Sequence, residues 1–176
     1  GCLGGEVAQT IMHQNEEAAN EVIREYRSIF GEDFYLEMMR HPNNEEKTRE
    51  VYNDQLYVNG VLQKLSNETG TKLLATNDAH FIDENDPPAH DRLICISTGK
   101  DVDDPNRMHY TRQEWFKTQR EMRELFADIP EAIHNTNEVI GKVEVYELDR
   151  DPIMPEFGLP DEFSDYNEYL RHVTFE

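Results

Sequence analysis

The sequence predicts an α/β fold with a parallel sheet. Two short apolar runs, residues 34–38 and 72–76, are separated by one long helical pattern and preceded by another. Strand, helix and strand joined by short connections are typical of βαβ units, whose strands pair in parallel. Hydrophobic residues make up 37% of the 176 residues and aromatic ones 10%, so the chain can form a core despite 31% charged residues.

The first helix is expected between Asn15 and Gly31. Asn15 is suited to cap the helix, Glu16 and Glu17 lie in its first turn, and Gly31 ends it. One face carries apolar residues at helical spacing: Ala19, Val22, Ile23, Tyr26, Ile29 and Phe30. This pattern predicts an amphipathic helix.

Residues 34–38 read as a strand that places Tyr35 and Glu37 on one face. After a polar loop at 41–44, a longer helix is expected at about 46–68, with Gly70 beyond its end. Its apolar stripe consists of Val51, Val58, Leu62 and Leu65. The second strand, residues 72–76, then runs directly into Asn77-Asp78-Ala79-His80.

The later part of the chain predicts further helices. One spans about 88–97 and ends at Gly99, and a polar loop follows at 100–106. Thr118 and Glu121 have the spacing of a capping box that opens a short helix. Another helix is expected from Pro130 to about Lys142, because proline is favoured in the first turn.

From residue 143 the composition changes. Residues 143–176 carry ten acids and two bases, with Pro152, Pro155 and Pro160 in the first half. This composition predicts an extended connection, followed by an amphipathic segment at 166–173 that begins a further unit. The chain begins without Met and stops soon after this pattern starts, so we expect it to be part of a longer polypeptide.

The charge excludes several classes of protein. The formal net charge is −20 and the pI is near 4.6. A surface this acidic repels phosphate backbones, so a simple nucleic-acid-binding module is excluded and any nucleic acid must be engaged through a metal site or a partner. No apolar run approaches the roughly 20 residues of a membrane span, and no secretory signal is present. Two cysteines are too few for a disulfide framework, which favours a reducing cytoplasmic setting.

Asp78 and His80 are the sharpest candidates for chemistry. They directly follow a strand, and the carboxyl ends of parallel strands commonly hold the active site. Side chains two residues apart point the same way along an extended chain, so both can reach one metal ion. The alternative is a loop in which Asp78 caps the following helix and His80 is solvated.

Cys2, Glu37 and His41 are weaker candidates. The Cys2 thiol is either a soft ligand for zinc or an inert small residue, and Cys95 is expected in the core. Glu37 lies among apolar neighbours, so its carboxylate must pair with a cation or hydrogen-bond donors, or line a polar cavity. His41 is expected to be solvated in its loop. The remaining histidines show no ligand spacing and are expected at the surface or as caps: His13, His90, His109, His134 and His172.

A series of sequence blocks resembles one segment of the bacterial DNA polymerase III alpha subunit family. The strongest block is Ala75-Thr76-Asn77-Asp78-Ala79-His80-Phe81, and the order and spacing of the blocks along nearly the whole chain make the resemblance specific. The others are Gly1-Cys2-Leu3, Gly5-Glu6-Val7, Phe34-Tyr35-Leu36-Glu37, Ala89-His90-Asp91, Leu93-Ile94-Cys95-Ile96, Thr98-Gly99-Lys100, Asp103-Asp104-Pro105-Asn106-Arg107, Glu121-Met122, Leu125-Phe126, Pro130-Glu131-Ala132-Ile133 and Asn135-Thr136.

The resemblance implies the second half of a PHP (polymerase and histidinol phosphatase) domain and its connection toward the palm of the polymerase. Residues 1–100 would form the C-terminal half of the PHP domain, 101–154 its end and a helical connector, and 155–176 the start of the link to the palm. The implied fold is part of a distorted seven-stranded β/α barrel, followed by an α-helical and extended connector. In this family the strand ends hold up to three metal ions, commonly zinc.

The family pattern also assigns residues. Asp78 and His80 match its last metal motif and Cys2 matches a cysteine ligand, whereas Glu37 and His41 match positions that line the site. The assignment of His41 is the weaker of the two, because this sequence has Arg40-His41-Pro42 where relatives usually have His-Gly. The first metal motif of the family, a His-x-His, is not in this sequence, and neither are the palm carboxylates that hold magnesium. Polymerase activity would therefore belong to the parent chain.

Three functions follow as hypotheses. The first is a piece of the replicative polymerase. Its metal site would cleave the phosphodiester of the 3′-terminal nucleotide of DNA and so act as a 3′–5′ phosphodiesterase for proofreading. The second is a structural organiser without chemistry, which braces the palm and docks a separate proofreading exonuclease. The third is a stand-alone PHP phosphoesterase, which the additional segment at 98–160 argues against. The implied partners are the rest of the alpha subunit, DNA and nucleotides, the exonuclease subunit and the sliding clamp, with no membrane.

Overall fold

The structure is a computed structural model that describes residues 2–43, 45–46, 48–153 and 155–175. Asn44 of the predicted loop and Lys47 of the predicted long helix lie outside the described residues, as do Gly1, Met154 and Glu176. The chain divides into two units, residues 1–143 and 144–176. The domain boundaries expected near 100 and 154 remain predictions.

The centre of the first unit is a parallel pair of strands. β1 (Leu36–Met38) pairs with β2 (Leu73–Ala75), with Leu36 opposite Leu73 and Met38 opposite Ala75. The first and last residues of both strands are buried and the middle ones half-buried, as the alternation of side chains requires. The predicted α/β character and parallel pairing are confirmed. Within the described residues the sheet has two strands, so the complete barrel remains a prediction.

The helices begin and end close to the predicted positions. α2 (Glu16–Phe30) is capped by Asn15, whose Oδ1 accepts a hydrogen bond of 2.8 Å from the Ala18 amide. α3 (Arg49–Thr69) ends at Gly70, which has a φ of +68° that suits glycine. α1 (Glu6–His13) and the 3-10 turn Gly31–Asp33 were not predicted, because Gly5 provides no side-chain cap for α1.

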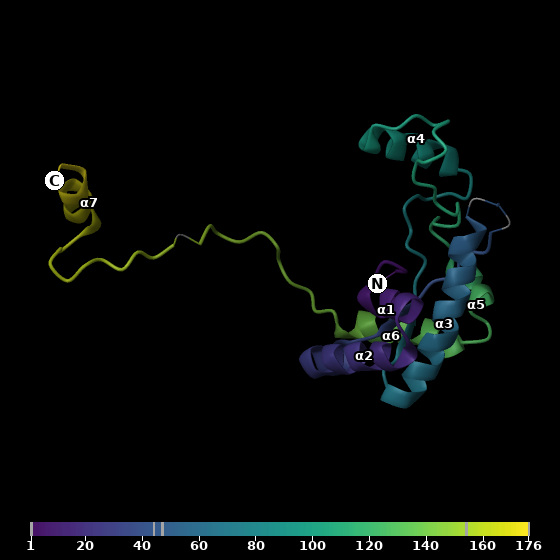
Figure 1. Ribbon diagram of the computed structural model, residues 1–176. Coiled ribbons are helices and arrows are strands. Elements are labelled where there is room, and N and C mark those ends of the chain that lie inside the picture. Colours follow the sequence, from purple (N-terminus) through teal and green to yellow (C-terminus); the bar gives the residue numbers. More distant parts are fainter. Residues whose placement is uncertain (1, 44, 47, 154, 176) are drawn as a thin grey trace. The chain divides into compact units, whose positions relative to one another are not determined.

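Five helices surround the strands. α5 (Gln119–Leu125) opens with the predicted capping box, and α6 (Pro130–Lys142) begins at the predicted proline. Figure 1 shows α1, α2, α3, α5 and α6 gathered in one body, where α3 packs on both strands and α6 on β2. The core between them contains the fully buried side chains of Ile23, Met38, Leu65, Phe126 and Ile129.

α4 (Pro87–Thr98) lies apart from the other helices of the first unit (Figure 1). Its second turn is fixed by Asp91, whose Oδ1 lies 3.2 Å from Nη1 of Arg107. Cys95 is buried, as predicted, and Gly99 ends the helix with a φ of +65°. The Asp91–Arg107 ion pair attaches α4 to the connection that follows it.

The second unit has a short helix, α7 (Tyr166–Phe175), where the sequence predicts an amphipathic segment. The rings of Phe163 and Tyr169 pack at 5.0 Å between centroids. Residues 144–153 form no helix or strand, and their apolar side chains, such as those of Val145 and Ile153, are exposed. The predicted extended connection is confirmed for these residues.

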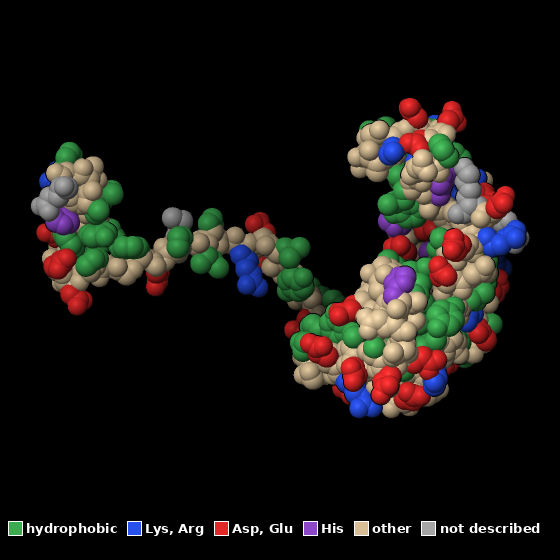
Figure 2. Space-filling model, viewed as in Figure 1, with side chains coloured by type: hydrophobic (Ala, Val, Ile, Leu, Met, Phe, Trp, Pro, Cys, Tyr) green, Lys and Arg blue, Asp and Glu red, His purple; other side chains and the backbone are tan. Residues whose placement is uncertain are grey.

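The surface reflects the composition. In Figure 2 acidic side chains are spread over the visible face of the first unit, with fewer Lys and Arg side chains between them. No helix in the described part of the chain combines the length and apolar character needed to cross a lipid bilayer.

Candidate functional site

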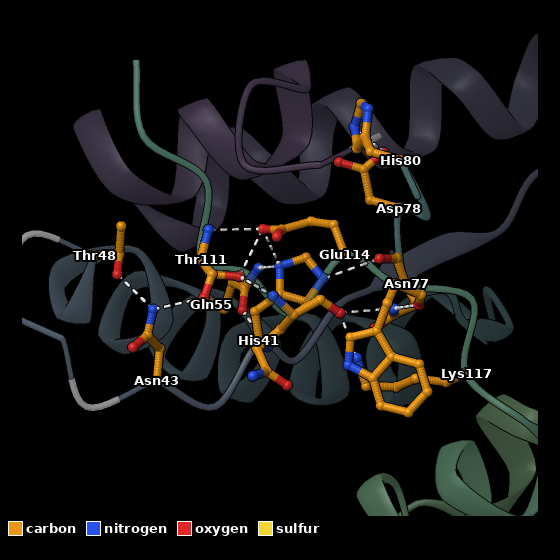
Figure 3. Close-up of polar contacts among 12 residues, drawn as sticks. His41, Asn43, Thr48, Gln55, Asn77, Asp78, His80, Thr111, Glu114 and Lys117 are labelled. Carbon is orange, nitrogen blue, oxygen red and sulfur yellow. Dashed lines mark hydrogen bonds and ion pairs between the residues drawn. The ribbon is translucent and has the colours of Figure 1, made fainter. Parts of the chain in front are cut away.

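Asp78 and His80 lie in the irregular segment after β2, residues 77–81, which we call the turn, and their side chains face each other (Figure 3). Asp78 Oδ1 lies 3.4 Å from Nε2 of His80, and the side chains are 42% and 35% exposed. The backbone of Asp78 is left-handed, with a φ of +48°, a conformation that aspartate tolerates better than most residues. The turn thus presents a carboxylate and an imidazole together to solvent.

The turn is held by a distant part of the chain, residues 113–116. The His80 amide donates to the Glu114 carbonyl at 2.7 Å, and the Phe116 amide donates to the Phe81 carbonyl at 3.0 Å. Asn77 Nδ2 donates to the carbonyls of Gln113 and Trp115 at 3.0 and 2.7 Å. These backbone groups fix the position of the turn, and no sequence pattern predicted the pairing.

A buried polar network lies beneath the turn and contains His41, which is 3% exposed (Figure 3). Nε2 of His41 lies 3.0 Å from the Asn77 carbonyl, so this nitrogen carries the proton. Nδ1 then accepts from Nε2 of Gln55 at 3.1 Å. The expectation of a solvated His41 is wrong, because the loop after β1 folds inward to bind Gln55 and Asn77.

Glu114 closes the network from the other side. Its Oε1 accepts hydrogen bonds from the amide and hydroxyl of Thr111, at 2.9 and 2.6 Å, and lies 3.5 Å from Nδ1 of His41. Glu114 is 3% exposed, and its Oε2 has no hydrogen-bond partner among the described residues. Burial lowers the pKa of His41, outweighing the opposing effect of Glu114, so the imidazole is neutral at neutral pH.

Lys117 adds a half-buried cation to the same segment. Its Nζ lies 4.5 Å from the centroid of the Trp115 ring. Burial lowers the pKa of Lys117 to about 8, with Glu114 and Glu121 opposing the shift. The segment after Tyr110 therefore concentrates charged groups that sequence spacing did not single out.

Cys2 and Glu37 lie at a separate small cavity. Both line a space of about 20 Å³ that Gln55 and Asn59 also border. Cys2 is exposed, and Glu37 Oε1 accepts a hydrogen bond of 2.7 Å from the Thr76 hydroxyl. Glu37 therefore meets the first expectation, because its carboxylate has a hydrogen-bond donor, whereas the cavity that it lines is bordered by polar and apolar side chains alike.

The predicted metal ligands are only partly assembled. Asp78 and His80 offer an oxygen and a nitrogen donor, a set that suits a divalent cation. Zinc commonly takes at least three protein ligands. Across the described residues, no group of three or more His, Cys, Asp or Glu side chains is arranged to hold a metal. Metal binding by Cys2, Asp78 and His80 therefore stays a prediction.

The parallel strands joined by α3, with a carboxylate and an imidazole in the segment after β2, define a part of an α/β protein. No family model matches the chain. Over nearly all of its length, however, it is similar to known bacterial replication proteins, and these relatives are DNA polymerase III alpha subunits.

The similarity extends across distant bacteria. The chain is 38% identical to the alpha subunit of Borreliella burgdorferi over 178 residues, which cover 99% of this chain and 15% of that protein. It is 35% identical to the Campylobacter jejuni protein over 187 residues, with 99% and 15% covered, and 32% identical to the Thermus aquaticus protein over 188 residues, with 99% and 14% covered. The predicted resemblance is confirmed, and the chain corresponds to about 15% of the length of the relatives it matches.

Proposed function

We propose that this chain is a segment of a replicative DNA polymerase alpha subunit that works in the cytoplasm. Residues 1–100 would belong to the PHP domain, 101–154 to its end and a helical connector, and 155–176 to the link toward the palm. The similarity to alpha subunits along 99% of the chain supports this proposal. DNA-directed DNA synthesis, with magnesium at palm carboxylates, would be the activity of the whole subunit, outside this segment.

Within that subunit, Asp78, His80 and Cys2 would contribute to a PHP metal site. The observation that carries this proposal is the 3.4 Å approach of Asp78 Oδ1 and His80 Nε2 at the end of β2. The remaining ligands would come from strands of the PHP barrel outside this chain. A divalent ion, expected to be zinc, would polarise a phosphodiester and lower the pKa of bound water when present.

Other residues of the site would hold the turn in position. Asn77 fixes the turn to the carbonyls of Gln113 and Trp115, and His41 supports the Asn77 carbonyl from below. Glu37 would line the site beside Cys2. Such rigid support keeps donor atoms in place without a cost of reorganisation when a ligand binds.

The proposed reaction is metal-dependent cleavage of the terminal phosphodiester at a DNA 3′ end. The acidic surface of this chain would repel DNA, so the substrate must be delivered by other parts of the complex. The partners would be the rest of the alpha subunit, DNA and nucleotides, the proofreading exonuclease subunit and the sliding clamp.

Metal content tests this function. Full-length subunits with His80→Ala or Asp78→Asn should contain less zinc than the wild type when purified identically. His134→Ala is the matched control, because His134 is exposed on α6. Equal zinc in the wild type and in His80→Ala would overturn the proposed metal site.

The second candidate is a structural organiser that braces the palm and docks the exonuclease. The acidic surface and the long helices α2 and α3 favour this alternative. A 3′–5′ exonuclease assay of the full-length subunit, purified without the exonuclease subunit, separates the two. Activity that is lost with chelator and in His80→Ala supports the metal site, whereas a wild type without activity supports the organiser.

A further inference from the structure

Two aromatic rings pack directly against His80, and a third packs on one of them. The ring of Tyr110 packs edge-on against His80, with centroids 4.8 Å apart, and against His90 at 4.9 Å. The His80 and His90 rings are 5.4 Å apart, and Phe81 packs on His90 at 5.2 Å. His80 therefore belongs to a compact aromatic cluster, although its side chain is 35% exposed.

The cluster joins three separate segments of the chain. His80 follows β2, His90 lies on α4, and Tyr110 lies in the long connection after α4. His90 was expected to be a surface or capping residue, and the structure instead half-buries it against Tyr110 and Phe81. The cluster therefore depends on contacts that keep these three segments together.

Asp91 provides that hold for His90 and Tyr110 together. Its two carboxylate oxygens lie 3.2 Å from Nη1 of Arg107 and 3.7 Å from Nη2 of Arg112. Asp91 is the next residue after His90, while the two arginines lie on either side of Tyr110 in the sequence. The side chains of Asp91 and Arg107 are 13% and 7% exposed, so their ion pair is largely shielded from solvent.

We propose that Tyr110 and His90 are positioning residues that hold the His80 imidazole so that its Nε2 faces Asp78. This inference rests on the proposed metal-binding function of Asp78 and His80. A solvent-exposed histidine on a turn would otherwise sample several rotamers, and only some of these bring Nε2 toward Asp78. Edge-to-face ring contacts restrict that freedom without using the donor atoms of the imidazole.

The surroundings of Tyr110 are consistent with this position. Its pKa is raised by burial and further by the nearby charges of Asp78, Glu114 and Cys2. Because the role assigned to Tyr110 is ring packing, its hydroxyl group is not required for it.

The test is the zinc affinity of metal-stripped, full-length subunits, measured by competition with a chromophoric chelator. Tyr110→Leu and His90→Ala should each weaken binding by about 10-fold, as is typical for residues that orient a ligand. Tyr110→Phe and His90→Phe keep an aromatic ring and should retain wild-type affinity. Tyr57→Leu and His134→Ala are matched controls, because Tyr57 and His134 are exposed on α3 and α6.

The outcomes separate this inference from the proposed function. Wild-type affinity in both Tyr110→Leu and His90→Ala, with binding lost in His80→Ala, overturns the positioning role alone. Equal binding by the wild type and His80→Ala overturns the proposed function and the inference with it. A loss of zinc affinity in Tyr110→Phe and His90→Phe would overturn ring packing as the cause. If Tyr110→Leu does not fold, as judged by thermal unfolding, the zinc affinities of His90→Ala and His90→Phe test the positioning role, because His90 lies on the separate helix α4.

Discussion

Replacing Asn77 with alanine should loosen the turn that carries Asp78 and His80. The substitution removes two hydrogen bonds, from Asn77 Nδ2 to the Gln113 and Trp115 carbonyls at 3.0 and 2.7 Å. Each neutral hydrogen bond contributes about 1 kcal/mol, so the opening free energy of the turn should fall by about 2 kcal/mol. The backbone carbonyl of Asn77 remains to accept from His41, so the network beneath the turn is kept.

Hydrogen exchange of the full-length subunit measures this effect locally. The His80 amide, which donates to Glu114 at 2.7 Å, should exchange about 30-fold faster in Asn77→Ala, because each 1.4 kcal/mol corresponds to about tenfold. Asn53→Ala, at an exposed position of α3, is the matched control and should leave the rate unchanged. Unchanged exchange at residues 76–82 in Asn77→Ala would refute the claim that residues 113–116 hold the turn.

Three further predictions concern stability. Burial lowers the pKa of His41 in the folded protein below its usual 6.5. The neutral imidazole should therefore leave the protein fully stable above pH 6.5, and stability should fall as the pH drops through the lower pKa of the folded state. His41→Gln should remove this pH dependence of the melting temperature. Hydrogen bonds from Lys72 and Tyr35 lower the pKa of Glu138 to about 2. The Glu138 carboxylate should therefore stabilise the fold above about pH 4.5, and this stabilisation should be lost as the pH falls toward 2. Glu138→Gln should lower the melting temperature at neutral pH and reduce its fall at acidic pH. Phe126→Ala should destabilise the first unit by about 3–5 kcal/mol in urea unfolding, while Phe116→Ala, at an exposed position, should cost less than about 0.5 kcal/mol.

Each of these has a contradicting result. A pH slope below 6.5 that persists in His41→Gln would assign it to another group. An unchanged fall of the melting temperature at acidic pH in Glu138→Gln would show that the Lys72 and Tyr35 contacts are not formed in solution. Equal effects of the two phenylalanine substitutions would place Phe126 outside the core.

Much of the local structure was predictable because its signals are local. Asn15, Gly70 and the Thr118–Glu121 pair mark helix ends through contacts within one turn, and all three were confirmed. The alternation around Glu37 correctly predicted the buried and half-buried faces of β1. The spacing of Asp78 and His80 correctly indicated that their side chains lie close together, but the extended chain assumed for them is wrong, because the backbone of Asp78 is left-handed.

The support of the site was not predictable, because it depends on contacts between residues far apart in sequence. The burial of His41 requires Gln55 on α3 and Asn77 after β2, neither of which carries a recognisable motif. Tyr110 and His90 meet His80 only after α4 and its following connection fold back. Periodicity predicts which face of an element is buried, and it does not predict which distant polar groups meet there.

Anomalous diffraction from crystals of the full-length subunit, collected at the zinc edge, tests the central claim most directly. The account predicts a peak about 2.0–2.2 Å from both His80 Nε2 and an Asp78 oxygen, with the Cys2 thiol at about 2.3 Å. Zinc bound elsewhere in the subunit, with Asp78 and His80 in contact only with each other, would contradict it.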